Sequence, residues 1–317
     1  MLIKKGINHS RKVILIFLIV QIQSVVSFSQ TIKTLNVNTA GTLSTLINET
    51  EQKTVTTLTL SGNIDARDFV FMRDKLRVLS SADLTSANIK AYTGTDGTNT
   101  GLLTTYSINE IPAYAFYNPV YNTFKYTLTS FKLPSTTTSI GYLAFYYCTM
   151  LSGTVTIPAS VKSIGEYAFY GCTQISSFSV ANNNSRYSSL NGVLFNKNQD
   201  TLFIFPGAKS GTYTIPASVK HVGASAFEGQ SNLMQLYFPS TLNSIGAYAF
   251  AFCNGVSGNL TLPSNLKKIE DGAFYGCSKL NGTVIIPAGL TDFGNYCFFE
   301  CNNISSFSVS ASNTAYA

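Results

Sequence analysis

A phrase that recurs at nearly constant spacing limits what this chain can fold into. It reads IPASVKSIGEYAFYGC at 157–172, LPSNLKKIEDGAFYGC at 262–277 and IPAGLTDFGNYCFFEC at 286–301. Its copies open on Pro134, Pro158, Pro216, Pro239, Pro263 and Pro287, at intervals of 24, 58, 23, 24 and 24 residues. A fixed period in this range predicts a solenoid. Because one coil of this length cannot bury a hydrophobic face alone, its stability must come from neighbouring coils.

Each coil is predicted to hold a short strand, a proline and a turn. The runs VTIP, LYFP, LTLP and VIIP alternate as a half-buried strand does, and proline then ends the strand. A branched residue and a glycine lead into Ala-Phe, which we interpret as one helical or 3-10 turn with the ring pointing inward. A degenerate copy, IPAYAF at 111–116, starts the array. The rings expected to stack are Phe145, Phe169, Phe227, Phe250, Phe274 and Phe298.

One repeat, at 181–216, is longer than the others and lacks the Ala-Phe pair. Val180 and Ile215, which end successive strands, are 35 residues apart instead of about 24. Within this interval the apolar runs Val193–Phe195 and Leu202–Phe205 flank the polar stretch Asn196–Asp200. This pattern predicts a β-hairpin in place of the usual turn.

The N-terminus carries the pattern of a secretory signal. Four basic residues precede the apolar run 13–20, and Ser27 and Ser29 supply small residues at −3 and −1 before Gln30. Residues 1–29 are therefore interpreted as a signal peptide cut after Ser29, and the chain as secreted or held at the cell surface. An uncleaved anchor is the alternative, although the run is short for a membrane span of about 20 residues. No cysteine that could form a lipobox lies in the first 147 residues.

Residues 30–105 differ from the repeats and are predicted to form an N-terminal cap, with the repeats over 106–317. We expect helices over 45–52 and 65–76, the second capped by Asp65, and a strand over 58–64. At the other end, 307–316 parallels 178–187, so a second long repeat begins where the sequence stops. A solenoid needs a polar cap at each end, and we expect further repeats and a cap beyond Ala317.

The cysteine spacing argues against disulfides. Five of the six cysteines (Cys148, Cys172, Cys253, Cys277 and Cys301) fall fourteen residues after their proline, and Gln230 fills this place in the remaining repeat. They should form a column in which the side chains point the same way, at least about 4.8 Å apart, whereas a disulfide needs Cβ atoms about 3.8 Å apart. We therefore expect buried thiols that pack as small apolar side chains. A metal site is not expected.

The residues of an enzyme active site are missing. After signal cleavage His221 is the single histidine, and it occupies the repeat position of Ser163, Ser244 and Lys268. The acidic residues form no convergent pair, and there is no GxSxG, phosphate loop or HExxH motif. The net charge falls from +6 to +2 once the four basic residues of the signal are removed, so no basic stripe favours nucleic acid or an anionic membrane. We predict a protein without catalytic activity or cofactor.

The outward face of the strands is the remaining candidate site. If the residue before each proline points inward, the residues one and three positions earlier point outward. The candidate ligand-binding residues on this face are Lys132, Thr154, Thr156, Thr212, Thr214, Gln235, Tyr237, Asn259, Thr261, Thr283 and Ile285. We expect them to form rows on a parallel sheet, suited to a glycan or an extended polypeptide. The alternative is that hydroxyl groups only solvate the strands, and Tyr237 is the best single candidate for an anchor.

The phrase IP-x-S-V-x-x-I-G-x-x-A-F-x-G-C at 23 to 24 residue spacing resembles the BspA-type leucine-rich repeat, over about 108–317. This resemblance implies a right-handed leucine-rich-repeat superhelix, a β-rich α/β solenoid. It also implies an exported adhesion protein of the kind found in Bacteroides-like anaerobes and Treponema, with an extracellular protein or glycan as ligand. Two other hypotheses are a glycan-capturing component of a polysaccharide-uptake system and a spacer for a domain that follows Ala317.

Overall fold

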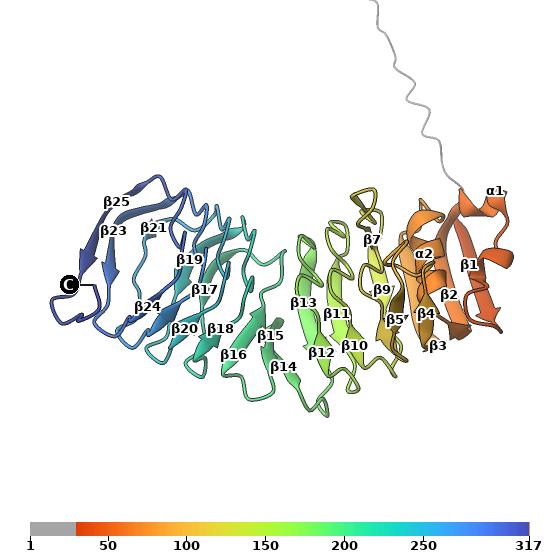
Figure 1. Cartoon of the computed structure of the whole chain (residues 1–317), viewed down its shortest axis with the longest axis horizontal. Helices are drawn as coiled ribbons and strands as arrows, with labels where there is room; N and C mark the ends of the chain where they lie inside the picture. The colour runs from red at the N-terminus through yellow and green to blue at the C-terminus, as the bar shows by residue number, and fades with distance from the viewer. Residues whose placement is uncertain (1–29, 317) are drawn as a thin grey trace, which may run out of the picture.

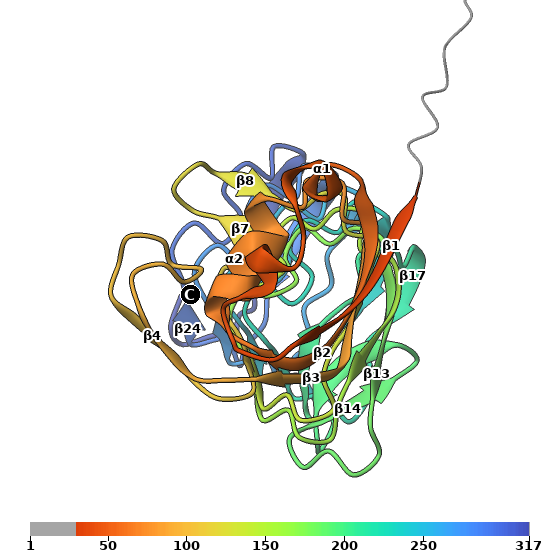
Figure 2. The ribbon, with the colours of Figure 1, turned by 90° about the vertical axis from the view of Figure 1, so that its right-hand side faces the viewer.

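The chain forms an elongated stack of coils with its N-terminal and C-terminal ends at opposite ends (Figure 1). The computed structural model describes residues 30–316, so the predicted signal peptide lies outside the described residues. Viewed along the stack, the coils enclose an interior, and α2 forms one side of the first coils (Figure 2). This interior is filled by buried hydrophobic residues. The prediction of a solenoid with coils of about 24 residues is confirmed. No helix among residues 30–316 is long and apolar enough to cross a membrane.

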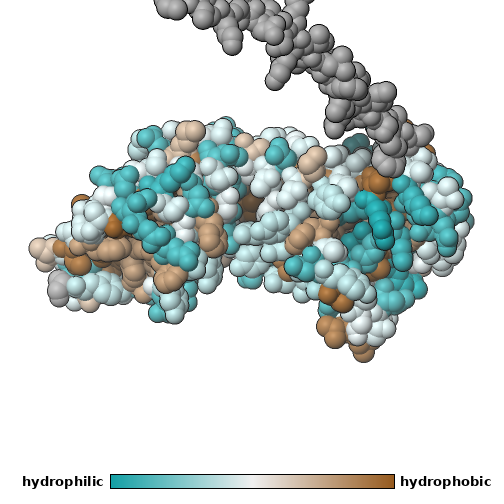
Figure 3. Space-filling model, turned by 90° about the horizontal axis from the view of Figure 1, so that it is seen from above, coloured by the Kyte–Doolittle hydropathy of each residue, from teal (hydrophilic) through white to brown (hydrophobic). Residues whose placement is uncertain are grey.

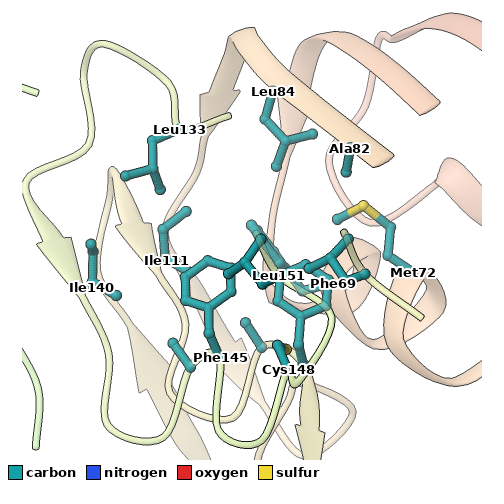
Figure 4. Close-up of a cluster of buried hydrophobic side chains, with 14 of the residues drawn as sticks. Phe69, Met72, Ala82, Leu84, Ile111, Leu133, Ile140, Phe145, Cys148 and Leu151 are labelled. Atoms are coloured by element: carbon teal, nitrogen blue, oxygen red, sulfur yellow. The ribbon is translucent and has the colours of Figure 1, made fainter. Parts of the chain in front are cut away.

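The first coils are built by residues 30–105 and continue directly into the repeats. A parallel sheet has the order β1-β2-β3-β9, so strand β3 pairs with a strand of the repeats. Its strands are β1 (Thr31–Val37), β2 (Val55–Ile64), β3 (Ser81–Ile89) and β9 (Ser130–Lys132). Figure 4 shows Phe69 and Met72 of this segment close to Phe145 and Cys148 of the repeats. One core therefore spans the predicted boundary at 105, and the division into cap and repeats stays a prediction.

Two predicted helices of this segment have different outcomes. Helix α2 (Ala66–Asp74) begins at Asp65, whose side chain accepts from the Arg67 N–H at 2.9 Å. Asp68 completes a capping box by accepting from the Asp65 N–H, also at 2.9 Å. The helix predicted over 45–52 is instead a 3-10 turn, η1 (Leu43–Thr45), and a short helix, α1 (Glu49–Gln52). Asn48 separates them because its side chain caps α1.

Every regular repeat contributes strands to two ladders. The first ladder precedes the prolines and comprises β9, β11 (Gly153–Ile157), β13 (Ile175–Val180), β17 (Gly211–Thr214), β19 (Leu233–Tyr237), β21 (Gly258–Asn259), β23 (Leu280–Ile286) and β25 (Ile304–Val309). The second follows them and comprises β6 (Glu110–Ile111), β10 (Ser139–Ile140), β12 (Ser163–Ile164), β18 (His221–Val222), β20 (Ser244–Ile245), β22 (Lys268–Ile269) and β24 (Asp292–Phe293). Two antiparallel hairpins leave the stack, β4 (Tyr92–Gly94) with β5 (Thr104–Tyr106) and β7 (Tyr117–Asn118) with β8 (Thr123–Phe124).

The Ala-Phe segment differs from the helical or 3-10 turn expected for it. In the repeat of Phe169 it consists of successive turns closed by bonds such as Ala168 N–H to the Gly165 carbonyl at 3.2 Å. The residues two before and two after the phenylalanine have left-handed backbones, with φ of 56° at Tyr167 and 74° at Gly171. A left-handed residue every fourth position interrupts any right-handed helix, so the segment folds around the phenylalanine instead. Among residues 75–316 the structure contains no helix.

The phenylalanine rings stack as predicted, but in two columns. Phe145 lies parallel to Phe169, with ring centroids 5.1 Å apart, and Phe274 to Phe298, also at 5.1 Å. Between Phe169 and Phe227 the column is broken, and Phe205 of the long repeat stacks only on Phe227, at 4.7 Å. The buried residues form two corresponding clusters. The long repeat therefore divides the core.

The long repeat contains the predicted hairpin and one further strand. Strands β15 (Val193–Asn196) and β16 (Thr201–Ile204) pair antiparallel, and β14 (Tyr187–Leu190) adds to the other edge of β15. Strand β16 then pairs parallel with β18 and so enters the second ladder. Strand β15 lies between the two clusters, because Leu194 belongs to the first and Val193 and Phe195 to the second.

The cysteines are free, buried and aligned. Four of the column thiols donate to the carbonyl of the phenylalanine in the preceding coil, such as Cys172 Sγ to Phe145 O at 3.1 Å and Cys277 Sγ to Phe250 O at 2.9 Å. Gln230 donates from Nε2 to the equivalent oxygen of Phe205 at 3.3 Å. A side chain at this position thus faces a buried carbonyl, and a thiol supplies a donor for it with little polar surface.

Candidate binding surfaces

All eleven residues predicted to face outward from the first ladder are exposed. The residues before the prolines point inward, and Ile157 and Ile215 are at most 1% exposed. Tyr237 and Ile285 are the large apolar members of the face, with 53% and 58% of their surface exposed. Strand alternation therefore sets the direction of these side chains, while their role in binding stays a prediction.

Polar side chains on this face pair between coils. Thr154 lies opposite Ser177, with hydroxyl oxygens 2.6 Å apart, and Thr283 lies opposite Ser306 at 2.8 Å. The remaining cross-coil pairs are Thr156 with Ser179, Thr212 with Gln235, Thr214 with Tyr237, Asn259 with Asn281, Ile285 with Ser308, and Lys132 with Asp83. Lys132 is the charged member, and its ammonium group lies 2.8 Å from the Asp83 carboxylate. Thr261 is exposed but follows the end of β21.

The rows lie on parallel strand pairs, which belong to several separate sheets. The first ladder is divided into the sheets β1-β2-β3-β9, β11-β13, β17-β19 and β21-β23-β25. The largest interruption follows β13, where the tip between β14 and β15 takes the place of the next strand, with Phe178 N–H donating to the Gly192 carbonyl at 2.8 Å. Lys132, Thr154 and Thr156 consequently lie on the N-terminal side of this hairpin tip, and the other eight candidates on its C-terminal side.

A second surface, which sequence reasoning missed, lies on the Ala-Phe turns. Tyrosine rings from successive repeats pack into a continuous cluster there. Tyr146 and Tyr170 stack with centroids 5.4 Å apart, and Tyr147 contacts Tyr170 edge to face, also at 5.4 Å. Tyr142 meets Tyr167 at 6.3 Å. The signal was the repeated tyrosine beside Ala-Phe, which the sequence shows but which alone does not say that the rings touch.

This tyrosine cluster ends at a cavity of about 410 Å³ in the long repeat. One wall is the turn around Phe169, and the other is the turn around Phe227, with Phe203, Phe205 and Gly207 between them. Figure 1 shows the coils spreading apart between β13 and β16. The cavity arises because Phe205 follows Leu202 of the second ladder by only three positions, whereas Phe169 follows Ile164 by five. The chain of the long repeat therefore bypasses the space of a complete turn.

Two unpartnered polar atoms lie in the far wall of this cavity. They are Glu228 Oε2 and Gln230 Oε1, both buried and without a hydrogen-bond donor in residues 30–316. Burial raises the pKa of the Glu228 carboxyl, an effect that the nearby Ser225 and Tyr170 hydroxyls oppose. Burial and the Glu228 charge also raise the pKa of Tyr170. The wall can therefore accept hydrogen bonds from a donor that enters the cavity.

Other polar groups have structural partners. His221 is exposed and aligned with Ser244, with Nδ1 2.8 Å from the serine hydroxyl, as its repeat position predicts. Residues 30–316 contain no group of three or more histidine, cysteine or acidic side chains arranged to hold a metal. Hydrophobic side chains also gather at the C-terminal end in Figure 3, where the final coil exposes Phe299, Phe307 and Tyr316.

Comparison with known families decides the identity of the repeat. A model of the BspA type leucine rich repeat region matches residues 109–204 and 202–316, with six copies. The chain belongs to the BspA-type leucine-rich repeat family. Proteins of this BspA-type family are typically binding or adhesion modules and typically not catalytic. No curated protein matches the chain.

The chain is also similar to solved structures. The pneumococcal vaccine antigen PcpA is 22% identical with a TM-score of 0.57, and the alignment covers 84% of this chain and 65% of that one. A leucine rich cell surface protein from Faecalibacterium prausnitzii is 19% identical with a TM-score of 0.49, covering 82% of this chain and 65% of that one. The chain thus spans about two thirds of the length of these proteins, and likeness at this identity concerns the fold alone.

Proposed function

We propose that this chain is an exported binding and adhesion module without catalytic activity, which recognises an extracellular protein or glycan through the outward face of its first ladder. The observation that carries the proposal is the exposure of all eleven candidate residues in cross-coil rows. These rows offer hydroxyl and amide groups at each strand spacing, about 4.8 Å apart, which suits a ligand with its own repeating polar groups.

Tyr237 is the proposed anchor of this face. Tyr237 is 53% exposed, and its hydroxyl donates to Gln235 Oε1, two residues before it in β19, at 3.4 Å. Thr214 lies directly opposite it in β17. An aromatic ring surrounded by small polar groups can stack on a sugar ring or fill a hydrophobic pocket of a protein partner. The same arrangement supports the alternative of a glycan-capturing component.

Binding of the purified chain to matrix proteins, mucins and a glycan array tests this proposal. The test variant combines Tyr237→Glu, Thr214→Arg and Thr261→Arg, and the control places the same charges elsewhere with His221→Glu, Ser163→Arg and Ser264→Arg. We expect the test variant to lose binding by more than tenfold and the control to retain it, since charge at an interface centre is strongly unfavourable. Equal binding by both would refute the strand-face site, and no binding by the parent chain would favour a spacer.

A further inference from the structure

The cavity in the long repeat is a place where the hydrogen-bond ladder between coils is open. In a regular pair of coils the turn backbones bond in alternation. Leu143, Phe145 and Tyr147 donate from N–H to the carbonyls of Glu166, Ala168 and Tyr170, at 3.2, 2.8 and 2.8 Å. The same three bonds recur where the turn around Phe227 meets the next coil. Each turn therefore donates forward at every second residue, as a strand in a parallel ladder does.

The turn around Phe169 has lost these partners. Its donors at the equivalent positions are the N–H groups of Tyr167, Phe169 and Gly171, and none of them has an acceptor within residues 30–316. On the opposite wall the carbonyls of Ala224 and Glu228 accept no hydrogen bond from any of these described residues. The central acceptor there, Ala226 O, is taken by Phe205 N–H at 2.8 Å. One wall thus presents donors and the other acceptors across the cavity.

The side chains around this open ladder define what it would hold. Gln230, which is 9% exposed, has an unpartnered Oε1, and Glu228 has an unpartnered Oε2. Tyr147, Tyr167 and Tyr170 present aromatic rings to the same cavity. A carboxylate beside aromatic rings favours a cation, and two buried acceptors without donors favour a group with several N–H bonds. The volume, about 410 Å³, lies within the range of about 300–1,000 Å³ found for ligand pockets.

We propose that this cavity binds a short extended peptide segment of a partner protein that carries a lysine or arginine. Its backbone carbonyls accept from Tyr167, Phe169 and Gly171, which replaces the missing coil, and its basic side chain pairs with Glu228. A peptide backbone fits because it offers acceptors at every second residue, the spacing of the unpaired donors, whereas a glycan has no such repeat. The site is separate from the strand face, so either site can fail without the other.

A soluble hexapeptide library, with one position fixed at a time, tests the site on the purified chain. Binding is measured by fluorescence polarisation, and location by amide hydrogen exchange. We expect pools with a fixed lysine or arginine to bind and to slow exchange at 167–171. Glu228→Gln keeps the shape but removes the charge, and should weaken these pools by about tenfold or more. Glu300→Gln, at an exposed acid on another turn, should change nothing.

A second variant blocks the space without altering the core. Gly229 has a left-handed backbone, with φ of 75°, and a Cβ there would meet no atom within 4 Å. The equivalent positions in other repeats hold Tyr147 and Phe252 with φ of 52° and 56°, so Gly229→Tyr is compatible with folding. It should abolish peptide binding in a folded chain whose melting temperature is a few degrees lower, because a side chain at this φ is strained, while the strand-face variant should bind peptide normally.

Three outcomes would overturn the proposal. The first is that no pool slows exchange at 167–171. The second is that peptides bind Gly229→Tyr as tightly as the parent chain. The third is that Gly229→Tyr loses binding of a glycan and not of a peptide, which would assign the cavity to sugars.

Discussion

The buried cysteine column should make the solenoid lose stability at alkaline pH, and Cys172 allows the size of the effect to be worked out. Its side chain is 4% exposed, and its thiol donates to the Phe145 carbonyl at 3.1 Å. Burial raises the pKa of this thiol from 9.0 to about 12. The unfolded chain therefore releases the proton roughly three pH units before the folded chain does.

The sign follows from proton counting. Between pH 9 and 12 the unfolded state binds fewer protons at this site than the folded state, so the free energy of unfolding falls as pH rises. The slope reaches about 1.4 kcal/mol per pH unit, and the accumulated loss at pH 10 is about 1.4 kcal/mol for this one thiol. Below pH 8 the contribution vanishes, because both states keep the proton. Burial raises the pKa of Cys297 to about 11, and this thiol acts in the same direction.

Urea unfolding of Cys172→Ala with a reductant present, at pH 7.5, 8.5, 9.3 and 10, measures this term. The variant loses packing at every pH, so its free energy of unfolding is below that of the parent. This difference, the disadvantage of the variant, should shrink by about 1.4 kcal/mol between pH 7.5 and 10. Val219→Ala is the matched control, since Val219 is fully buried and has no proton to release. Its disadvantage should stay constant. If the Cys172→Ala disadvantage is also constant, the thiol is either ionised in the folded state or protected in the unfolded one, and the reasoning fails.

Three further perturbations test other parts of the structure. Burial lowers the pKa of Lys125 to about 8 from 10.5, so the folded parent chain loses this proton at lower pH than the unfolded chain and becomes more stable as pH rises. Lys125→Met lacks this gain. Its free energy of unfolding relative to the parent should therefore fall by about 3 kcal/mol from pH 7.5 to above 10.5. Phe274→Ala removes a ring stacked between Phe250 and Phe298 and should cost about 3–5 kcal/mol in urea unfolding, against less than about 1 kcal/mol for the exposed Phe299→Ala. Asp65→Ala removes the N-cap of α2 and should lower stability by about 1–2 kcal/mol, whereas equal stability would show that Asp68 alone holds the helix start.

The repeat period made most of this fold predictable. A phenylalanine at one place in each coil must face the interior, and so must its equivalent in the next coil, so stacking of Phe250 on Phe274 follows from spacing. Alternation before each proline likewise predicted which strand residues are exposed. The turns were not predictable in the same way. Tyr248 has a left-handed backbone, which its residue type does not favour, and its N–H donates to the Asp271 carbonyl of the next coil at 3.0 Å.

The candidate sites show the same division. The sequence located the long repeat and its hairpin, because Ala-Phe is absent and two apolar runs flank a polar one. It did not reveal that the hairpin tip would pair beside β13 and split the strand face. Nor did it reveal the cavity, although the three-residue step from Leu202 to Phe205 is readable once the ladder position of Leu202 is known. Both features depend on which strands pair with each other, and strand pairing is set by residues far apart in the sequence.

The long repeat also sets how the two halves of the solenoid depend on each other. In a regular array each coil is stabilised by its neighbours, and unfolding spreads along the stack through these interfaces. Between Phe169 and Phe205 the ring column and three backbone hydrogen bonds are both missing, so this junction couples the halves least. A peptide that fills the cavity would restore the bonds and stabilise the halves jointly, by an amount that rises with the logarithm of its concentration above Kd. Peptide binding at this junction would therefore bring the unfolding midpoints of the two halves closer together. Binding to the strand face on one side of the junction would not produce this response.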